Sequence, residues 1–239
     1  CTILSGKEVS DYTYRNLKGR VDLLLNNNIQ PGLAAILVGE NPASEIYINM
    51  KTKMFHKLGL KTETYKLSSV CSQNELLQVI ETINKDSSYH GILVQLPLPN
   101  HIDSNSIIFS IKPEKDVDGF HPENVGLLSI GTPRFTPCTP KGIMRILEYY
   151  KINLSGKHVV VLGRSNIVGR PMSILTSLKT KWANSTTTIC HSGSSDIGKF
   201  TKSADVIIVA LGVPNYLKKD MIKKDAILID VGINRINDN

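Results

Sequence analysis

The sequence predicts an α/β protein with two domains built on parallel sheets and a cleft between them. Short runs recur that are apolar throughout rather than alternating, which is expected of strands buried on both faces of a parallel sheet. The segments between these runs carry apolar residues at helical spacing. A chain of 239 residues suits one large or two modest domains, because typical domains hold about 100–200 residues.

The expected strands are the apolar runs Ala34–Val38, Gly91–Leu96, His158–Leu162, Thr187–Cys190, Asp205–Leu211 and Ala226–Val231. The expected helices are Ser44–Leu58, Gln73–Asn84, Pro140–Tyr150 and Val168–Leu178. Ser72 and Glu75 form an S-x-x-E capping box before the second helix. Pro171 lies early in the last helix, where its missing N–H costs little.

A turn signal at 154–157 precedes a new strand and indicates that a second domain begins nearby. We assign the domains to residues 1–138 and 139–239. The segment Lys112–Pro137 is rich in Pro, Gly and Asp and lacks periodicity. We expect it to be a loop too polar for the core, and long ordered loops are often functional.

Composition narrows the function classes. Hydrophobic residues make up 41% and charged residues 21% of the chain, as in soluble globular proteins. The net charge of +7 comes from scattered lysines without interleaved aromatics, which argues against nucleic-acid binding. The apolar runs are too short to cross a membrane and the first residues lack a signal-peptide core, so no membrane role and a cytoplasmic location are expected, with an organelle left open. The four cysteines lack zinc-site spacing and are interpreted as reduced thiols, with no metal.

Tyr47 and Lys51 lie four residues apart in a predicted helix, which places both side chains on one face. Gln95 ends a buried strand, and Asp118 lies in the polar segment beyond it. Because ligands bind at the carboxyl ends of parallel strands, Lys51, Gln95 and Asp118 could converge there. Taken singly, Lys51 is more typical of a solvated helix lysine, Tyr47 of a half-buried core residue, and Asp118 of a turn before Gly119. For Gln95, a buried amide that must find partners, a structural and a functional role are equally open.

A second constellation follows the strand that ends at Leu162. The segment Gly163–Gly169 is a glycine turn before a helix, and free N–H groups at such a helix start favour a phosphate. It departs from G-x-G-x-x-G, so an ordinary strand–helix turn remains the alternative. The next strand ends without the carboxylate that binds a ribose hydroxyl. We therefore expect Arg164, Ser165 and Ser192 to hold the 2′-phosphate of NADP rather than NAD, with a surface role for Arg164 as the alternative, and we assign His191 a structural or solvent-facing role.

Several motifs occur together in one order. The chain resembles the bifunctional methylenetetrahydrofolate dehydrogenase/methenyltetrahydrofolate cyclohydrolase family in the segments Gly39–Ser44, Tyr47-x-x-x-Lys51, Val94–Pro99, Lys115–Pro122, Pro137–Pro140 and Gly163–Pro171. The resemblance implies an oxidoreductase and hydrolase of one-carbon metabolism and purine biosynthesis, with tetrahydrofolate substrates and a Rossmann-like, doubly wound second domain. It also implies a homodimer, and a folate-loop segment and final helix that would follow Asn239.

The resemblance also implies residue roles. Lys51 matches the catalytic lysine, Gln95 the amide paired with it, and Tyr47 a stacking and positioning tyrosine. Asp118 matches the carboxylate that grips the pterin, and Ser44 and Pro97 match residues beside the folate. The cofactor-binding positions are Gly163, Arg164, Ser165, Ile167, Ser192, Gly212 and Ile233.

The chemistry explains these residue types. Hydride transfer needs orientation more than acid or base, whereas hydrolysis must take a proton from water and give one to a departing nitrogen. An amine that alternates with its ammonium form serves both steps, and Lys51 is the candidate. Gln95 could hold this amine without adding charge. Two alternatives stay open at this point: a dehydrogenase with weak cyclohydrolase activity, and a non-catalytic nucleotide-binding module.

Overall fold

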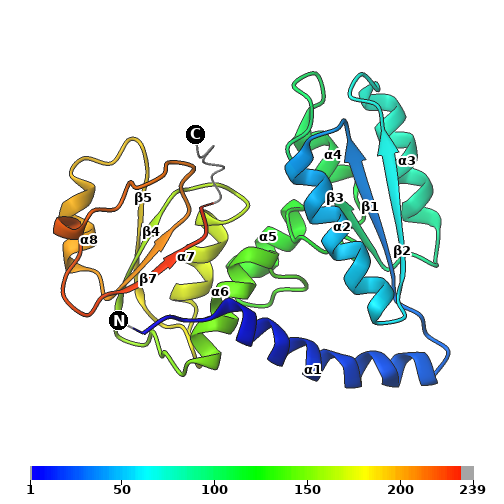
Figure 1. The fold of residues 1–239 in the computed structure, drawn as a ribbon. Coiled ribbons are helices and arrows are strands. Elements are labelled where there is room, and N and C mark those ends of the chain that lie inside the picture. Colours follow the sequence, from blue (N-terminus) through cyan, green and yellow to red (C-terminus); the bar gives the residue numbers. More distant parts are fainter. Residues whose placement is uncertain (1, 233–239) are drawn as a thin grey trace, which may run out of the picture. The chain divides into compact units, whose positions relative to one another are not determined.

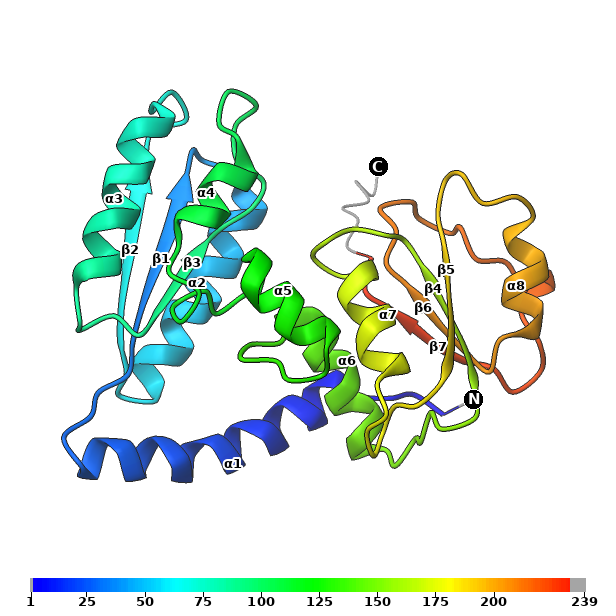
Figure 2. The same cartoon turned by 180° about the vertical axis from the view of Figure 1, so that it is seen from behind.

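The computed structural model describes residues 2–232, except for the side chain of Ala43. The chain forms two compact units (Figures 1 and 2). The N-terminal unit comprises Ser10–Gly126, and the C-terminal unit combines the chain from Leu127 onward with the residues up to Val9. The predicted boundary between residues 138 and 139 stays a prediction.

The N-terminal unit contains a parallel sheet of three strands in the order β2 (Lys61–Leu67), β1 (Gly32–Val38) and β3 (Gly91–Val94). Every residue of β1 is buried. Successive side chains of a strand point to opposite faces, so each face of the sheet needs its own cover. The helices that supply it are α2 (Pro42–Lys57), α3 (Gln73–Lys85) and α4 (Ser104–Ser110), and α1 (Gly6–Asn26) precedes the sheet.

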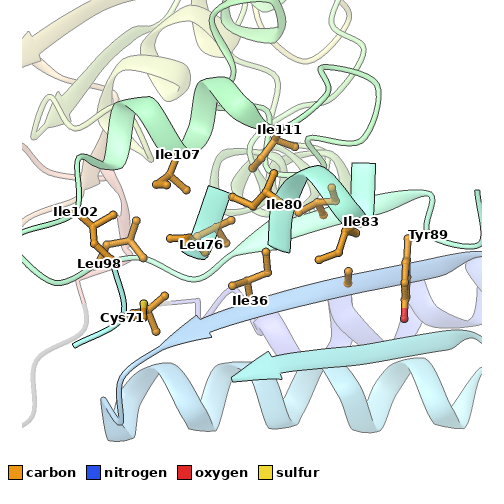
Figure 3. Close-up of a cluster of buried hydrophobic side chains, with 14 residues drawn as sticks. Ile36, Cys71, Leu76, Ile80, Ile83, Tyr89, Leu98, Ile102, Ile107 and Ile111 are labelled. Carbon is orange, nitrogen blue, oxygen red and sulfur yellow. The ribbon is translucent and has the colours of Figure 1, made fainter. Parts of the chain in front are cut away.

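The two faces of β1 have different neighbours. Ile36 packs with Leu76 and Ile80 of α3 and with Ile107 of α4 in one buried cluster (Figure 3). Ala35 and Leu37, on the opposite face, pack with Ile48 of α2. Helix α3 begins with the predicted capping box, in which Ser72 and Glu75 each accept a backbone N–H of the other residue.

The C-terminal unit contains a parallel sheet in the order β5 (Thr186–Cys190), β4 (His158–Leu162), β6 (Val206–Val209) and β7 (Ile227–Asp230). Its helices are α6 (Cys138–Tyr149), α7 (Gly169–Ser177) and α8 (Ile197–Ser203), and a short 3₁₀ helix, η1, spans Lys219–Met221.

The faces of this second sheet also bury different residues. Val159 and Val161 pack with Leu147 of α6 and Met172 of α7. Val160 and Leu162 belong to a second cluster, which Ile197 and Phe200 of α8 cover. Helices on both faces of a parallel sheet, with β4 between β5 and β6, make this a doubly wound Rossmann-like arrangement (Figure 2). The predicted α/β fold class, with two domains on parallel sheets and a Rossmann-like second domain, is confirmed. The cleft between the domains stays a prediction.

All six predicted strands and four predicted helices form, with ends shifted by up to two residues. The sequence analysis did not identify the helices α1, α4 and α8 or the strand β2. The prediction of an uncovered polar loop at 112–137 is wrong in two respects: α5 (Pro122–Ser129) forms within it, and Asp116, Asn124 and Leu128 are buried. Within the described residues, no helix is both long and apolar enough to cross a membrane.

Candidate active site

The carboxyl edge of the N-terminal sheet gathers several of the predicted residues. Strands β1 and β3 are parallel neighbours, so their carboxyl ends lie at the same edge. The backbone N–H of Gln95 extends this pairing by donating to the Ile36 carbonyl at 2.9 Å. Helix α2 begins four residues after β1 ends, which brings Ser44 to this edge.

Helix α2 presents Tyr47 and Lys51 on one stripe. Ser44 is 4% exposed and Ile48 is 2% exposed, so these two residues form the buried stripe of the helix. Tyr47 is 36% exposed, and Lys51, four residues later on the same face, is partly exposed. Tyr47 is thus neither fully buried nor fully exposed, so the half-buried interpretation stays open, and the exposed part of its ring is accessible to a ligand.

Gln95 and Pro97 lie in the segment that leaves β3. Gln95 is partly buried, and its Nε2 donates to the carbonyl of Leu96 at 2.9 Å. This bond fixes which end of the amide carries the acceptor oxygen. Pro97 is exposed and follows a cis peptide bond. The polar head of Gln95 thus stands at the end of a rigid, fully buried strand.

Asp118 belongs to a segment that lies beside β3. Asp116 forms a parallel bridge with Ile92, so the chain from Asp116 to Asp118 runs toward the same carboxyl edge that carries Gln95. The two aspartates differ in environment. Asp116 is 2% exposed, whereas Asp118 is partly exposed, which fits the prediction that Asp118 is the ligand-binding member of the pair.

In the C-terminal unit, the loop after β4 is closed by two glycines. Gly163 has φ +115°, and a Cβ there would lie 2.5 Å from the Ala210 carbonyl oxygen. A Cβ on Gly169 would lie 2.1 Å from the Gly163 carbonyl oxygen. Only glycine fits such contacts, and the close approach brings the start of α7 over the ends of β4 and β6. A glycine turn at a helix start is the arrangement expected of a phosphate site, and the binding of a dinucleotide here stays a prediction.

Ser165 is hydrogen-bonded to the backbone at the start of α7. Its Oγ accepts the N–H groups of Val168 at 3.1 Å and Gly169 at 3.4 Å, which satisfies donors at the start of α7. The hydroxyl therefore has a structural role that the sequence analysis did not identify. Its predicted contact with a 2′-phosphate stays a prediction.

Arg164 and His191 together form a pair of donors. The Nδ1 atom of His191 accepts the N–H of Gly193 at 3.0 Å, so a neutral ring carries its proton on Nε2. That Nε2 lies 3.4 Å from the Arg164 Nη1, and arginine only donates. An acceptor placed between them, such as an anion, would satisfy both groups. His191, assigned above to a structural role, is thus a further candidate for the phosphate site.

The remaining predicted cofactor-binding residues differ in the space around them and in their exposure. A Cβ on Gly232, after β7, would lie 2.5 Å from the Leu211 carbonyl oxygen, whereas the space beside Gly212 is open. Ile167 and Ser192 are exposed. Ile233 lies outside the described residues. Beneath this edge, burial raises the pKa of the Cys190 thiol, which favours the uncharged form.

Comparison with known proteins decides the family. Residues 4–118 match the model of the tetrahydrofolate dehydrogenase/cyclohydrolase catalytic domain, and residues 137–239 match that of its NAD(P)-binding domain. A relative from Acetivibrio thermocellus, named bifunctional protein FolD, is 48% identical over 98% of this chain and 81% of its own length. The chain belongs to the tetrahydrofolate dehydrogenase/cyclohydrolase family.

Solved structures of family members have the same fold as this chain. The Campylobacter jejuni bifunctional FolD dehydrogenase/cyclohydrolase is 47% identical and superposes with a TM-score of 0.94 over 99% of this chain and 83% of its own. The Trypanosoma brucei enzyme, solved with NADP cofactor and an inhibitor, is 33% identical with a TM-score of 0.93, over all of this chain and 81% of its own. The Trypanosoma brucei structure holds NADP, and the C-terminal part of this chain matches an NAD(P)-binding domain.

Proposed function

We propose that this chain oxidises 5,10-methylenetetrahydrofolate with NADP⁺ and hydrolyses the product, 5,10-methenyltetrahydrofolate, to 10-formyltetrahydrofolate. One observation carries the proposal: both family domains match along one chain, whose relatives are bifunctional enzymes. The activity belongs to folate one-carbon metabolism.

The folate is held at the carboxyl edge of the N-terminal sheet. Asp118 accepts hydrogen bonds from the pterin amino and ring N–H groups, because a carboxylate offers two acceptor oxygens. The exposed ring of Tyr47 stacks on the flat ligand, and Ser44 and Pro97 line it. These contacts orient the one-carbon unit, which is the main requirement of hydride transfer.

NADP⁺, when bound, supplies the hydride acceptor. The residues that hold it are the glycine cradle at Gly163 and Gly169, with Arg164, His191 and Ser192 on the 2′-phosphate side. The two converging donors, Arg164 and His191, support a phosphate rather than a ribose hydroxyl at this position. A charge-assisted, bidentate contact from arginine gives the strongest discrimination.

Hydrolysis uses the amine of Lys51. Water attacks the methenyl carbon while Lys51, in its neutral form, takes the proton that the water loses. The bond from that carbon to N5 then breaks as the ammonium returns a proton to N5. The hydroxyl on the carbon loses its own proton to solvent as its C=O forms, which leaves the formyl group on N10. Gln95 holds the amine through its amide oxygen, since its Nε2 already donates to the Leu96 carbonyl. A neutral partner leaves both forms of the amine accessible.

Three further expectations concern the location of the protein, the use of its product and its oligomeric state. We infer that the protein acts in the cytoplasm, that its product supplies purine biosynthesis, and that it forms a homodimer through the C-terminal unit. In the described part of the chain, the sheet of that unit ends on β5, which pairs with β4 alone, so its outer edge is suited to pairing with a second copy. Light scattering that gives the mass of a single chain would contradict the dimer.

A paired assay tests the proposed function. The full-length protein is incubated with NADP⁺ and 5,10-methylenetetrahydrofolate, and NADPH formation is recorded. In a second reaction without nucleotide, the loss of methenyltetrahydrofolate absorbance is followed. We expect both reactions to be faster than their uncatalysed rates. Oxidation without hydrolysis would support a plain dehydrogenase, and neither reaction would support a non-catalytic module.

A further inference from the structure

We propose that Asn124 and Asp116 are positioning residues for folate binding, because a buried hydrogen bond between their side chains fixes the loop that carries Asp118. The inference rests on the proposed function, in which Asp118 contacts the pterin. Asn124 and Asp116 themselves are 0% and 2% exposed, so they act through the loop and not on the ligand.

The bond closes the loop on both sides of Asp118. The Asn124 Nδ2 donates to the Asp116 Oδ2 at 2.8 Å and to the Pro113 carbonyl, also at 2.8 Å. The same Oδ2 accepts the backbone N–H of His121 at 2.8 Å. The stretches of chain before and after Asp118 are thereby tied together by three bonds.

A tight turn transmits this constraint to Asp118. The Gly119 N–H donates to the Asp116 carbonyl at 3.1 Å, which is the i to i+3 bond of a β-turn with Asp118 at its third position. Gly119 has φ +70°, a conformation that favours glycine. The direction of the Asp118 carboxylate therefore depends on where Asp116 is held.

The segment before the turn is anchored to the sheet and to α3. The Ile92 N–H donates to the Lys115 carbonyl at 2.7 Å. The Lys115 ammonium donates to the carbonyls of Ile83 at 3.0 Å and Asp86 at 2.7 Å, at the end of α3 where a cation is favourable. After Asp118, the chain is held by the buried hydrogen bonds of Asn124 and Asp116 and by an edge contact between the rings of His121 and Phe109.

Losing one partner of a buried carboxylate is costly, because the charge loses its solvation without compensation. In Asn124→Leu the side chain keeps its approximate shape but removes both donated bonds. The carboxylate of Asp116 then moves to hydrogen-bond with other donors, and the turn that contains Asp118 moves with it. We expect tetrahydrofolate affinity to fall about tenfold or more, as for a displaced hydrogen bond to a charged group.

A double-mutant cycle tests this role. Equilibrium titration with tetrahydrofolate, without nucleotide, is performed on the full-length protein and on Asn124→Leu, Asp118→Ala and the double variant. If Asn124 acts through Asp118, the double variant binds as weakly as Asp118→Ala alone. A double variant whose loss is the product of the two single losses would overturn the inference.

Two further variants separate positioning from folding. In Asp116→Asn, the Oδ1 can accept both N–H groups that Oδ2 accepts, so affinity stays within about threefold of the wild type, whereas Asp116→Ala reproduces the loss in Asn124→Leu. If Asn124→Leu does not fold, this pair decides alone: equal losses in both Asp116 variants would overturn the inference. A normal affinity in Asp118→Ala would instead refute the proposed role of Asp118.

Discussion

The folate side and the nucleotide side of this protein are built by different means. At the carboxyl edge of the N-terminal sheet, the proposed chemistry belongs to the polar side chains of Lys51, Gln95 and Asp118. At the corresponding edge of the C-terminal sheet, it belongs mainly to backbone, which Gly163 and Gly169 allow to approach closely. Moving a proton needs a titratable group, whereas holding a phosphate needs N–H groups and room.

This difference determines which substitutions are harmful. On the folate side, a change that preserves shape but removes a functional group should abolish chemistry and leave the fold intact. On the nucleotide side, a single added methyl group should disturb the fold itself. The following predictions test that contrast.

The largest effect is expected from Lys51→Met, which keeps an unbranched side chain but removes the amine. We expect hydrolysis to fall about 10²–10⁴-fold, the usual contribution of general acid–base catalysis. NADPH formation should survive in part, because hydride transfer needs no proton at this residue. Equal losses in both activities, measured on the same preparation, would contradict a proton-transfer role.

Arg164→Gln tests the side-chain component of the nucleotide site. Removing a charged donor should weaken NADP⁺ binding about 10–100-fold and leave NAD⁺ binding nearly unchanged. Arg170→Gln is the matched control, because Arg170 lies six residues later and donates to Asn166 Oδ1 at 3.0 Å. If titration calorimetry showed the same loss in both variants, general charge rather than the 2′-phosphate would explain the result.

Gly163→Ala tests the backbone component. The positive φ and the 2.5 Å approach to the Ala210 oxygen predict a loss of about 1–3 kcal/mol in the free energy of unfolding. Gly212→Ala is the control, since the space beside Gly212 is open, and its stability should stay close to that of the wild type. Denaturant titration of both variants without nucleotide decides, and two equally stable variants would refute the steric argument.

The smallest predicted effect, on stability, concerns a polar network at the start of β6, away from the carboxyl edge of the C-terminal sheet. Lys223 donates to Asp205 Oδ1 at 2.6 Å and holds the pKa of that carboxyl below its ordinary value, with help from the His158 N–H. A carboxyl whose pKa is lower in the folded state than in the unfolded state stabilises the fold at pH values above its unfolded-state pKa of about 3.9. This stabilisation is lost as the pH falls through the folded-state pKa.

Asp205→Asn should therefore cost about 0.5–1 kcal/mol near neutral pH, since the pair is partly screened by solvent. The difference from the wild type should vanish in acid, below the folded-state pKa of Asp205. Unfolding free energies measured across this range provide the test. A difference that persists unchanged at low pH would mean that the ion pair is not its source.

The sequence predicted the parts of the fold in which one physical signal dominates. Strands such as β4 are apolar throughout because both faces are buried, and this pattern is readable directly. Strand β2, Lys61–Leu67, lies at a sheet edge with partly exposed residues, so its polar composition hid it. Helix α1 is rich in polar residues and exposed along most of its length, and its apolar stripe was too narrow to stand out.

The candidate site was predictable for residues that meet a ligand and less so for residues that support them. Lys51, Gln95 and Asp118 belong to motifs, and the topology brings their segments to one edge. Asn124 and Asp116 look like ordinary loop residues in the sequence, because their importance comes from burial that only the folded chain creates. The sequence alone indicated a passive role for His191, since its nearness to Arg164 depends on the adjacency of β4 and β5.

Competition by a non-reacting folate tests most directly the central claim that one site in the N-terminal unit serves both reactions. Folic acid is added to the NADP⁺-dependent oxidation and, separately, to methenyltetrahydrofolate hydrolysis. We predict competitive inhibition with the same inhibition constant in both assays, raised by the same factor in Asp118→Ala. Two different constants, or a shift in one assay alone, would show that the two reactions use separate folate sites.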